Sequence, residues 1–150
     1  MTNEEIKEYI AGIHPSATFD EGGEWLNINI ESTEWGRLAK LLYRAPFDFN
    51  YLFCLTCVDW KTHLTMVYHL TSTHHRHTIV IKAKLDRENP VIETVSNIWR
   101  TAEFHEREVY EMFGVQFTDH PDLRRLILTD DFKDYPLRKD FEDPINMIKL

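Results

Sequence analysis

Cys54 and Cys57 form a C-x-x-C spacing, which in redox proteins supplies a reactive thiol pair. Such a pair sits at a helix N-terminus, where the helix dipole lowers the thiol pKa. Here both cysteines fall within Tyr51–Asp59, which has the length and the apolar content of a central strand. Residues at i and i+3 of a strand point to opposite faces. We therefore predict two small core residues, and two cysteines are too few to hold an iron–sulfur cluster on this chain.

Five histidines lie close together in the chain and invite a metal-site interpretation. No cysteine or carboxylate accompanies them at the spacing of a structural zinc site. His105-Glu106 opens like the H-E-x-x-H motif of zinc enzymes, but Val109 stands where the second histidine is required. We expect solvated loop and strand histidines, and keep a stand-alone metal-dependent enzyme as an alternative. The five are His63, His69, His74, His75 and His77.

Motifs for nucleotide binding and covalent catalysis are missing from the sequence. Gly22-Gly23 lacks the G-x-G-x-x-G spacing, and no G-x-x-x-x-G-K-[ST] stretch is present. No serine stands in a G-x-S-x-G nucleophile elbow. A small proton-transfer site stays open, because carboxylates and histidines are plentiful.

The densest group of charged residues lies where the period is helical. Glu103 and Arg107 are spaced i, i+4, and Arg107 can also reach Glu111. Two further stretches rich in charge and proline follow, at 120–126 and 135–141. By spacing alone, the first group belongs to an ordinary amphipathic helix, and the two later stretches belong to a solvated tail.

Hydrophobic periodicity predicts the elements that must position these residues. Thr2 and Glu5 form a capping box that starts a helix ending before Pro15. A second helix follows Ser32-Thr33 and closes before Pro46, a short one lies near 94–99, and a longer one near Ala102–Phe113. Strands are predicted at 25–30, 51–59, 64–71 and 78–85, with a hairpin connection at 72–75.

These elements predict an α+β fold with helices packed on a roughly four-stranded sheet. Gly114 is placed to end the last helix, because the left-handed conformation is easy for glycine. We predict an α+β domain over residues 1–114 and an extended, partner-binding segment over 115–150. The expected core comprises Trp35, Leu38, Phe53, Leu55, Met66, Ile79, Ile81 and Ile98.

Composition limits the partners. The 150 residues carry a net charge of −8, which disfavours binding to nucleic acid and to an anionic lipid surface. The N-terminus lacks the basic start and apolar run of a secretory signal, and no stretch is apolar enough to span a bilayer. We expect a cytoplasmic protein, and if it works at a membrane, another protein must hold it there.

The C-terminal segment differs in charge from the rest. Residues 1–119 hold 11 basic and 18 acidic groups, whereas residues 120–141 hold five of each. Arg124-Arg125 and Arg138-Lys139 lie among prolines, which favour extended backbone. Arginine binds carboxylates bidentately and is enriched at interfaces, so a segment laid on a partner and a solvated tail both fit this pattern.

The last helix and the segment after it closely resemble the signature of the C subunit, or 30 kDa subunit, of respiratory NADH:quinone oxidoreductase (complex I). The family pattern is E-R-E, an acid three residues on, two apolar residues, and later a basic and apolar cluster. A Pro-Leu-Arg-Lys-Asp-Phe block follows at 136–141. The residues that carry the resemblance, and that we predict to form an interface with a partner, are Glu106, Arg107, Glu108, Tyr110, Glu111, Phe113, Gly114, His120, Pro121, Arg124, Arg125, Pro136, Leu137, Arg138, Lys139, Asp140 and Phe141, with Met112, Leu126 and Ile127 completing the pattern.

The resemblance implies a non-catalytic structural and assembly subunit of the cytoplasmic arm of a proton-translocating enzyme. It implies no catalytic, cofactor or metal residues on this chain, with NADH, FMN, iron–sulfur clusters and quinone on partner proteins. The main partner would be the D subunit of the same complex, and the location peripheral at the cytoplasmic face of the cell membrane. The alternatives are the equivalent subunit of a membrane-bound hydrogenase or of another quinone reductase, and a binding module for an unrelated protein.

Overall fold

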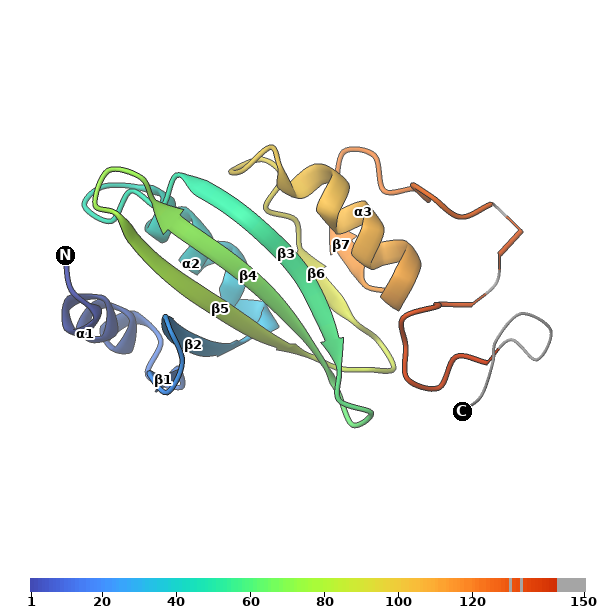
Figure 1. Ribbon diagram of the computed structural model, residues 1–150, viewed down its shortest axis with the longest axis horizontal. Coiled ribbons are helices and arrows are strands. Elements are labelled where there is room, and N and C mark those ends of the chain that lie inside the picture. Colours follow the sequence, from blue (N-terminus) through green and yellow to red (C-terminus); the bar gives the residue numbers. More distant parts are fainter. Residues whose placement is uncertain (130, 133, 143–150) are drawn as a thin grey trace.

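The computed structural model describes residues 1–129, 131–132 and 134–142, and Figure 1 shows its course. Three helices are present in this part of the chain: α1 (Asn3–Ile13), α2 (Ser32–Tyr43) and α3 (Ala102–Phe113). The predicted capping box starts α1, because the Thr2 hydroxyl accepts the Glu5 N–H and the Glu5 carboxylate accepts the Thr2 N–H.

A mixed five-stranded sheet forms the centre of the molecule. Its order is β1 (Thr18–Asp20), β2 (Leu26–Glu31), β5 (His77–Leu85), β4 (Leu64–Ser72) and β3 (Tyr51–Asp59). Strands β3, β4 and β5 form an antiparallel meander, and β2 runs parallel to β5. A separate parallel pair joins β6 (Val91–Glu93) to β7 (Gln116–Thr118). The α+β class is confirmed.

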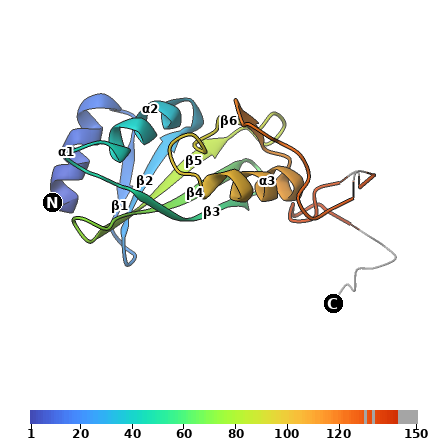
Figure 2. The same ribbon diagram turned by 90° about the horizontal axis from the view of Figure 1, so that it is seen from above.

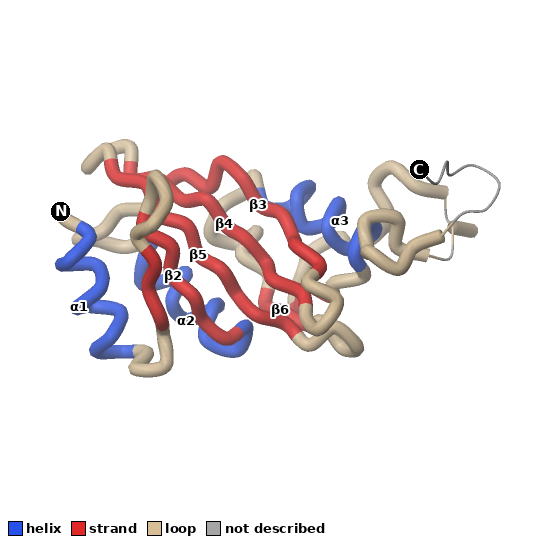
Figure 3. Tube along the Cα trace, turned by 60° about the horizontal axis from the view of Figure 1, so that its bottom comes forward, coloured by secondary structure: helices blue, strands red, loops and turns tan. Residues whose placement is uncertain are grey.

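The helices cover one face of the sheet. In Figure 2 they lie on the same side, and in Figure 3 the strands lie in front of α2. The core between the layers is continuous and includes apolar residues from every helix and from β2 to β5. Burying each large apolar side chain stabilises the fold by about 1.5–3 kcal/mol. Six of the eight predicted core residues are buried: Trp35, Leu38, Leu55, Met66, Ile79 and Ile81.

The other two predicted core residues lie outside the fully buried set. Phe53 is 36% exposed, because the register of β3 shifts between Leu52 and Cys54 and turns this side chain away from the core. Ile98 is only partly buried. The prediction was therefore wrong for Phe53 and correct only in part for Ile98.

Some predicted elements also differ from the structure. The helix expected near 94–99 is a turn in which the Val95 carbonyl accepts the N–H groups of Ile98 and Trp99. Strand β1 makes the sheet five-stranded, and β6 and β7 were not expected. The predicted extended segment 115–150 contains β7, while its residues 130, 133 and 143–150 lie outside the described chain.

Candidate functional site

Helix α3 carries three charged side chains that are buried: Glu106, Arg107 and Glu111. The helix ends at Gly114, whose φ of 81° is left-handed and whose N–H donates to the Tyr110 carbonyl. The chain then turns back and lies over the helix. We call the described residues of this stretch, 119–129, 131–132 and 134–142, the strap. Buried charges need partners, and the strap supplies them for two of the three.

Arg107 and Glu111 hold the first half of the strap by its backbone. The Arg107 guanidinium donates to the carbonyls of Arg124 and Arg125, both at 3.0 Å. The Glu111 carboxylate accepts the N–H groups of residues 126, 127 and 128 at 2.9–3.1 Å. Hydrogen bonds to charged groups contribute about 1.5–3 kcal/mol each. The two residues therefore fix the backbone of five successive residues.

This half of the strap presents apolar side chains outward. Leu126 is 40% exposed and Ile127 is 66% exposed, although their N–H groups point inward to Glu111. Phe104 on α3 is also exposed, and the Arg107 guanidinium lies 5.6 Å from its ring centroid. A segment that is held by its backbone and turns its apolar side chains outward is suited to form a contact surface.

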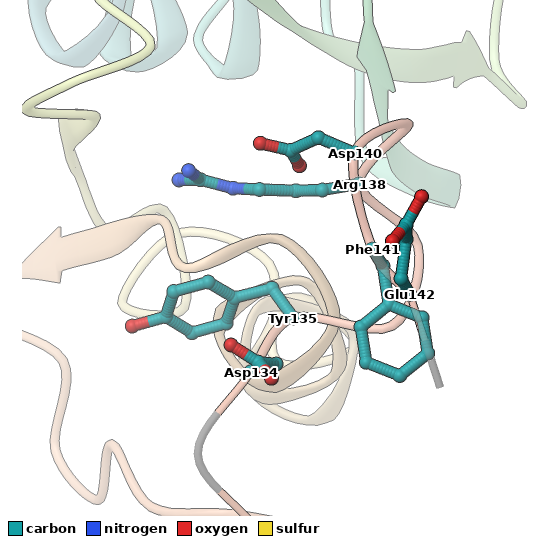
Figure 4. Close-up of a pocket in the computed structure, with 6 residues that line it drawn as sticks. All are labelled: Asp134, Tyr135, Arg138, Asp140, Phe141 and Glu142. Atoms are coloured by element: carbon teal, nitrogen blue, oxygen red, sulfur yellow. The ribbon is translucent and has the colours of Figure 1, made fainter. Parts of the chain in front are cut away.

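The second half of the strap is held at the C-terminal end of α3. The Leu137 N–H donates to the Met112 carbonyl at 3.1 Å, and Arg138 Nε donates to the Phe113 carbonyl at 2.6 Å. Figure 4 shows the Arg138 side chain extended between Asp140 and the Tyr135 ring, whose centroid lies 5.0 Å from its guanidinium. The Leu137 side chain faces outward and is 54% exposed.

Asp59, the last residue of β3, ties the strap to the sheet. Its buried carboxylate accepts two hydrogen bonds from Arg87 at 2.9–3.0 Å, and the N–H groups of Lys61 and Lys139 at 2.8–2.9 Å. Arg87 also pairs with Asp140 at 3.2 Å. The Arg87 guanidinium above all holds the pKa of the Asp59 carboxyl well below its usual range. Sequence reasoning missed Asp59 and Arg87; an acid closing an apolar strand was the available signal.

Glu106 faces the core and does not touch the strap. Its Oε1 accepts the Thr94 hydroxyl at 2.9 Å and the Val95 N–H at 3.1 Å. Its Oε2 is buried without a partner among the described residues, as is the Tyr68 hydroxyl. Burial raises the pKa of Glu106 to about 7 against these two hydrogen bonds. Glu106 thus fixes the turn that leads into α3.

The other predicted site residues lie at different depths. His120 accepts the Asp122 N–H at Nδ1, so the ring proton on Nε2 is the one directed at the Glu103 carbonyl. Arg124 is exposed and pairs with Asp122 at 3.0 Å, whereas Arg125 is half-buried. The remaining predicted residues divide by burial. Two are buried, Phe113 and Gly114; three are half-buried, Tyr110, Pro136 and Phe141; and three are exposed, Glu108, Pro121 and Lys139.

The cysteines and histidines do not converge. Cys57 is buried in the core, and burial raises the pKa of its thiol to about 12. Cys54 lies on the other face of the sheet, opposite His69 in the strand register. His75 bonds to the Pro46 carbonyl and His77 to the Asn3 side chain. Among the residues that the structure describes, no three His, Cys, Asp or Glu side chains are grouped to hold a metal ion.

The fold and the strap define a class: a small α+β domain that holds a C-terminal segment in a fixed path by buried charges. The family model described as the 30 Kd subunit of respiratory-chain NADH dehydrogenase matches residues 28–145. The chain belongs to this family. The family resemblance expected from the sequence is confirmed.

Individual relatives agree with this assignment. The joint C/D subunit of the NADH-quinone oxidoreductase of Phocaeicola vulgatus is 46% identical over 115 residues, which cover 75% of this chain and 22% of that protein. This chain therefore spans about a fifth of that relative. The C subunit of the F(420)H(2) dehydrogenase of Methanosarcina mazei is 38% identical over 143 residues, 91% of this chain and 90% of that protein.

A solved structure has the same fold. A chain of the membrane-bound sulfane sulfur reductase, an archaeal respiratory membrane complex, superposes with a TM-score of 0.77 at 27% identity and covers 93% of this chain and 85% of that one. No helix within the described part of the protein has the length and apolar character needed to cross a bilayer.

Proposed function

We propose that this chain is a non-catalytic structural and assembly subunit of the peripheral arm of a proton-translocating NADH:quinone oxidoreductase. Its main partner is the D subunit, and NADH, FMN, iron–sulfur clusters and quinone bind to other proteins of the complex. It lies at the cytoplasmic face of the membrane through the complex. Family membership supports this role, and a relative whose name joins C with D supports the choice of partner.

The fixed backbone of the strap is the main support for this proposal. Arg107 and Glu111 hold its backbone from inside, so its shape is set before a partner arrives. Preorganisation of this kind lowers the entropic cost of association. Ile127 and Leu137 then offer exposed apolar side chains from one fastened segment. Of the predicted site residues, Arg107 and Glu111 act by fixing the strap, and those that are exposed contact the partner.

A second candidate is the equivalent subunit of a related complex with another electron donor. The relative named as the C subunit of F(420)H(2) dehydrogenase, matched over 90% of its length, favours this alternative. Assaying the purified complex with NADH and with reduced deazaflavin as donors separates the two.

The docking role is tested by replacing Ile127 and Leu137 together with Ser. Both side chains are exposed, and surface changes alter folding stability by about 0.5 kcal/mol or less. The double variant should keep the urea midpoint of the parent. It should fail to co-purify with the D subunit and fail to restore quinone reductase activity to a strain that lacks this chain.

The matched control is Val91→Ser, an exposed apolar residue on β6, which should assemble normally. Normal assembly of the double variant would contradict the proposal. A fall in the urea midpoint large enough to leave the double variant unfolded under the assembly conditions would show that the two residues serve only the fold.

A further inference from the structure

The face of the sheet away from the helices is built in two halves. Residues on it lie in rows set by the strand register: Asn27, Val80 and His69 form one row, and Asn29, Lys82 and Val67 the next. A third row holds Glu31, Lys84 and Thr65. We call this the open face. No helix of the described chain covers it, as Figure 3 shows.

One half of the open face is a basic groove. Lys82, at the centre of the sheet, and Lys84 line it together with His63, Asn29 and Thr65, and with one acid, Glu31, at its β2 side. Lys82 is half-buried, and neither lysine has an ion pair or hydrogen bond among the described residues. The positive charge of Lys82 contributes, after burial, to the lowered pKa of His69. A lysine that packs its stem on the sheet and has no counter-ion leaves its ammonium available to bind an anion.

The other half of the open face is aromatic. The rings of Trp25 and His69 lie 5.8 Å apart, and Phe53 contacts both, at 6.1 Å and 5.6 Å. Tyr51 stacks on Phe53 at 6.1 Å and is exposed. Exposed aromatic clusters mark binding surfaces.

On the open face, the three central strands β3, β4 and β5 are less acidic than the molecule as a whole. The whole chain carries −8, yet no Asp or Glu of β3, β4 or β5, all fully described, lies on the open face. Two acids lie on the β1–β2 side of the face, Asp20 and Glu31, and Glu31 is the register neighbour of Lys84 and lines the groove. Lys82 and Lys84 are alternate residues of one strand, so their stems are about 6.6 Å apart. That spacing equals the spacing of alternate carboxylates in an extended peptide.

We propose that the open face binds an extended acidic segment of a neighbouring protein in the complex, with carboxylates on Lys82 and Lys84 and apolar side chains on the aromatic half. This is a second contact surface, separate from the strap, and it rests on the proposed function in that the chain must sit in a complex. Lys82 and Lys84 complement the charge of an acidic segment, because β3, β4 and β5 place no Asp or Glu beside them on this face.

Carbodiimide cross-linking of the purified complex tests the occupant directly, because this reagent joins a lysine only to a carboxylate in contact with it. Lys82 and Lys84 should be cross-linked to Asp or Glu of another protein of the complex. They should also be at least ten-fold less reactive to an amine-acylating reagent in the complex than in the isolated chain.

Three results would overturn the proposal. The lysines could react equally in both states, they could link only to carboxylates of this chain, or they could be protected without any carboxylate link. All three results are obtained on purified complex, which exists only if the strap has docked. A negative result on the open face is therefore distinct from a failure of the strap to dock.

Charge reversal gives an independent measurement. Lys82→Glu/Lys84→Glu should lower the yield of assembled complex at least ten-fold while the urea midpoint of the isolated chain stays near that of the parent. Arg37→Glu/Arg44→Glu, an equal charge change at exposed positions of α2 and its C-cap, should assemble at parental yield. Converting the cross-linked carboxylate of the neighbour to Lys should restore assembly of the first variant; no restoration would show that the lysines do not meet that acid.

Discussion

At the scale of single residues, Glu106 shows how burial can dominate local hydrogen bonds. Thr94 and Val95 both donate to Oε1, which favours the carboxylate, yet the pKa is raised to about 7 because burial disfavours the charge more strongly. The folded protein therefore binds this proton more tightly than the unfolded chain does.

This shift predicts a pH dependence of folding. The contribution of Glu106 is fully present below about pH 4.5 and is lost as the pH rises through about 7, which lowers stability by up to about 3 kcal/mol. Burial lowers the pKa of His69 and His77, which acts in the opposite direction over part of this range. The measurement is therefore the difference between Glu106→Gln and the parent in urea unfolding at pH 5 and pH 8. The variant should gain on the parent as the pH rises.

Glu108→Gln, on the exposed side of the same helix, serves as the control and should follow the parental profile. A constant difference between Glu106→Gln and the parent across this pH range would refute the assignment.

At the scale of elements, strong periodicity was sufficient to predict the long helices and strands, whereas short elements escaped it. Helix α3 was predicted at its observed bounds because an apolar stripe runs up to a glycine. Strands β1, β6 and β7 have three residues each, too few to show alternation. The sequence near 94–99 has helical spacing, but the Val95 carbonyl accepts two bonds and closes a turn instead. In β3 the bulge put Phe53 outside, which no alternation rule could reveal.

Gly114 joins the last helix to the strap, and its replacement should loosen both. An Ala side chain would be strained at φ 81°, and its Cβ would lie 2.7 Å from the Tyr135 ring. Gly114→Ala should lower the free energy of unfolding by about 1–3 kcal/mol and speed tryptic cleavage after Arg138.

Gly12→Ala is the matched control in helix α1, where nothing lies within 4 Å of the added methyl group. It should stabilise the protein by about 0.5–1 kcal/mol. Equal effects of the two substitutions in the same direction would rule out the contact with Tyr135.

At the scale of the whole molecule, the sequence indicated that the strap matters but not how it is held. Arg124 and Arg125 were predicted as side chains that bind a partner, whereas the chain itself uses their backbone carbonyls as acceptors for Arg107. Glu111 was predicted as part of the partner interface, and in this chain it is a buried acceptor for three N–H groups. Such pairings join residues 15 to 18 positions apart through tertiary structure, which periodicity does not encode.

Asp59 is the point where sheet, loop and strap meet, and its neutralisation should weaken all three. Asp59→Asn leaves Arg87 without its carboxylate partner and should destabilise the protein by about 1.5–3 kcal/mol at pH 7. Because the folded pKa of Asp59 is depressed, its contribution is complete above about pH 4 and is lost as the pH falls below that value. The deficit of the variant in urea unfolding should therefore shrink on acidification.

Asp119→Asn tests the specificity of this effect, since Asp119 is exposed and both residue types tolerate its left-handed φ of 64°. It should leave stability unchanged at both pH values. A deficit of Asp59→Asn that does not vary with pH would show that the lost hydrogen-bond acceptor, and not the charge, matters.

The way the strap is fastened separates its path from its surface chemistry. Glu111 and Arg107 bind only peptide groups at positions 124 to 128, and every residue other than proline provides those groups alike. The outward side chains at 126 and 127 can therefore be exchanged without redirecting the backbone that displays them. A different partner could be accommodated by changing those side chains alone, which makes this stretch a natural graft site for re-targeting the domain.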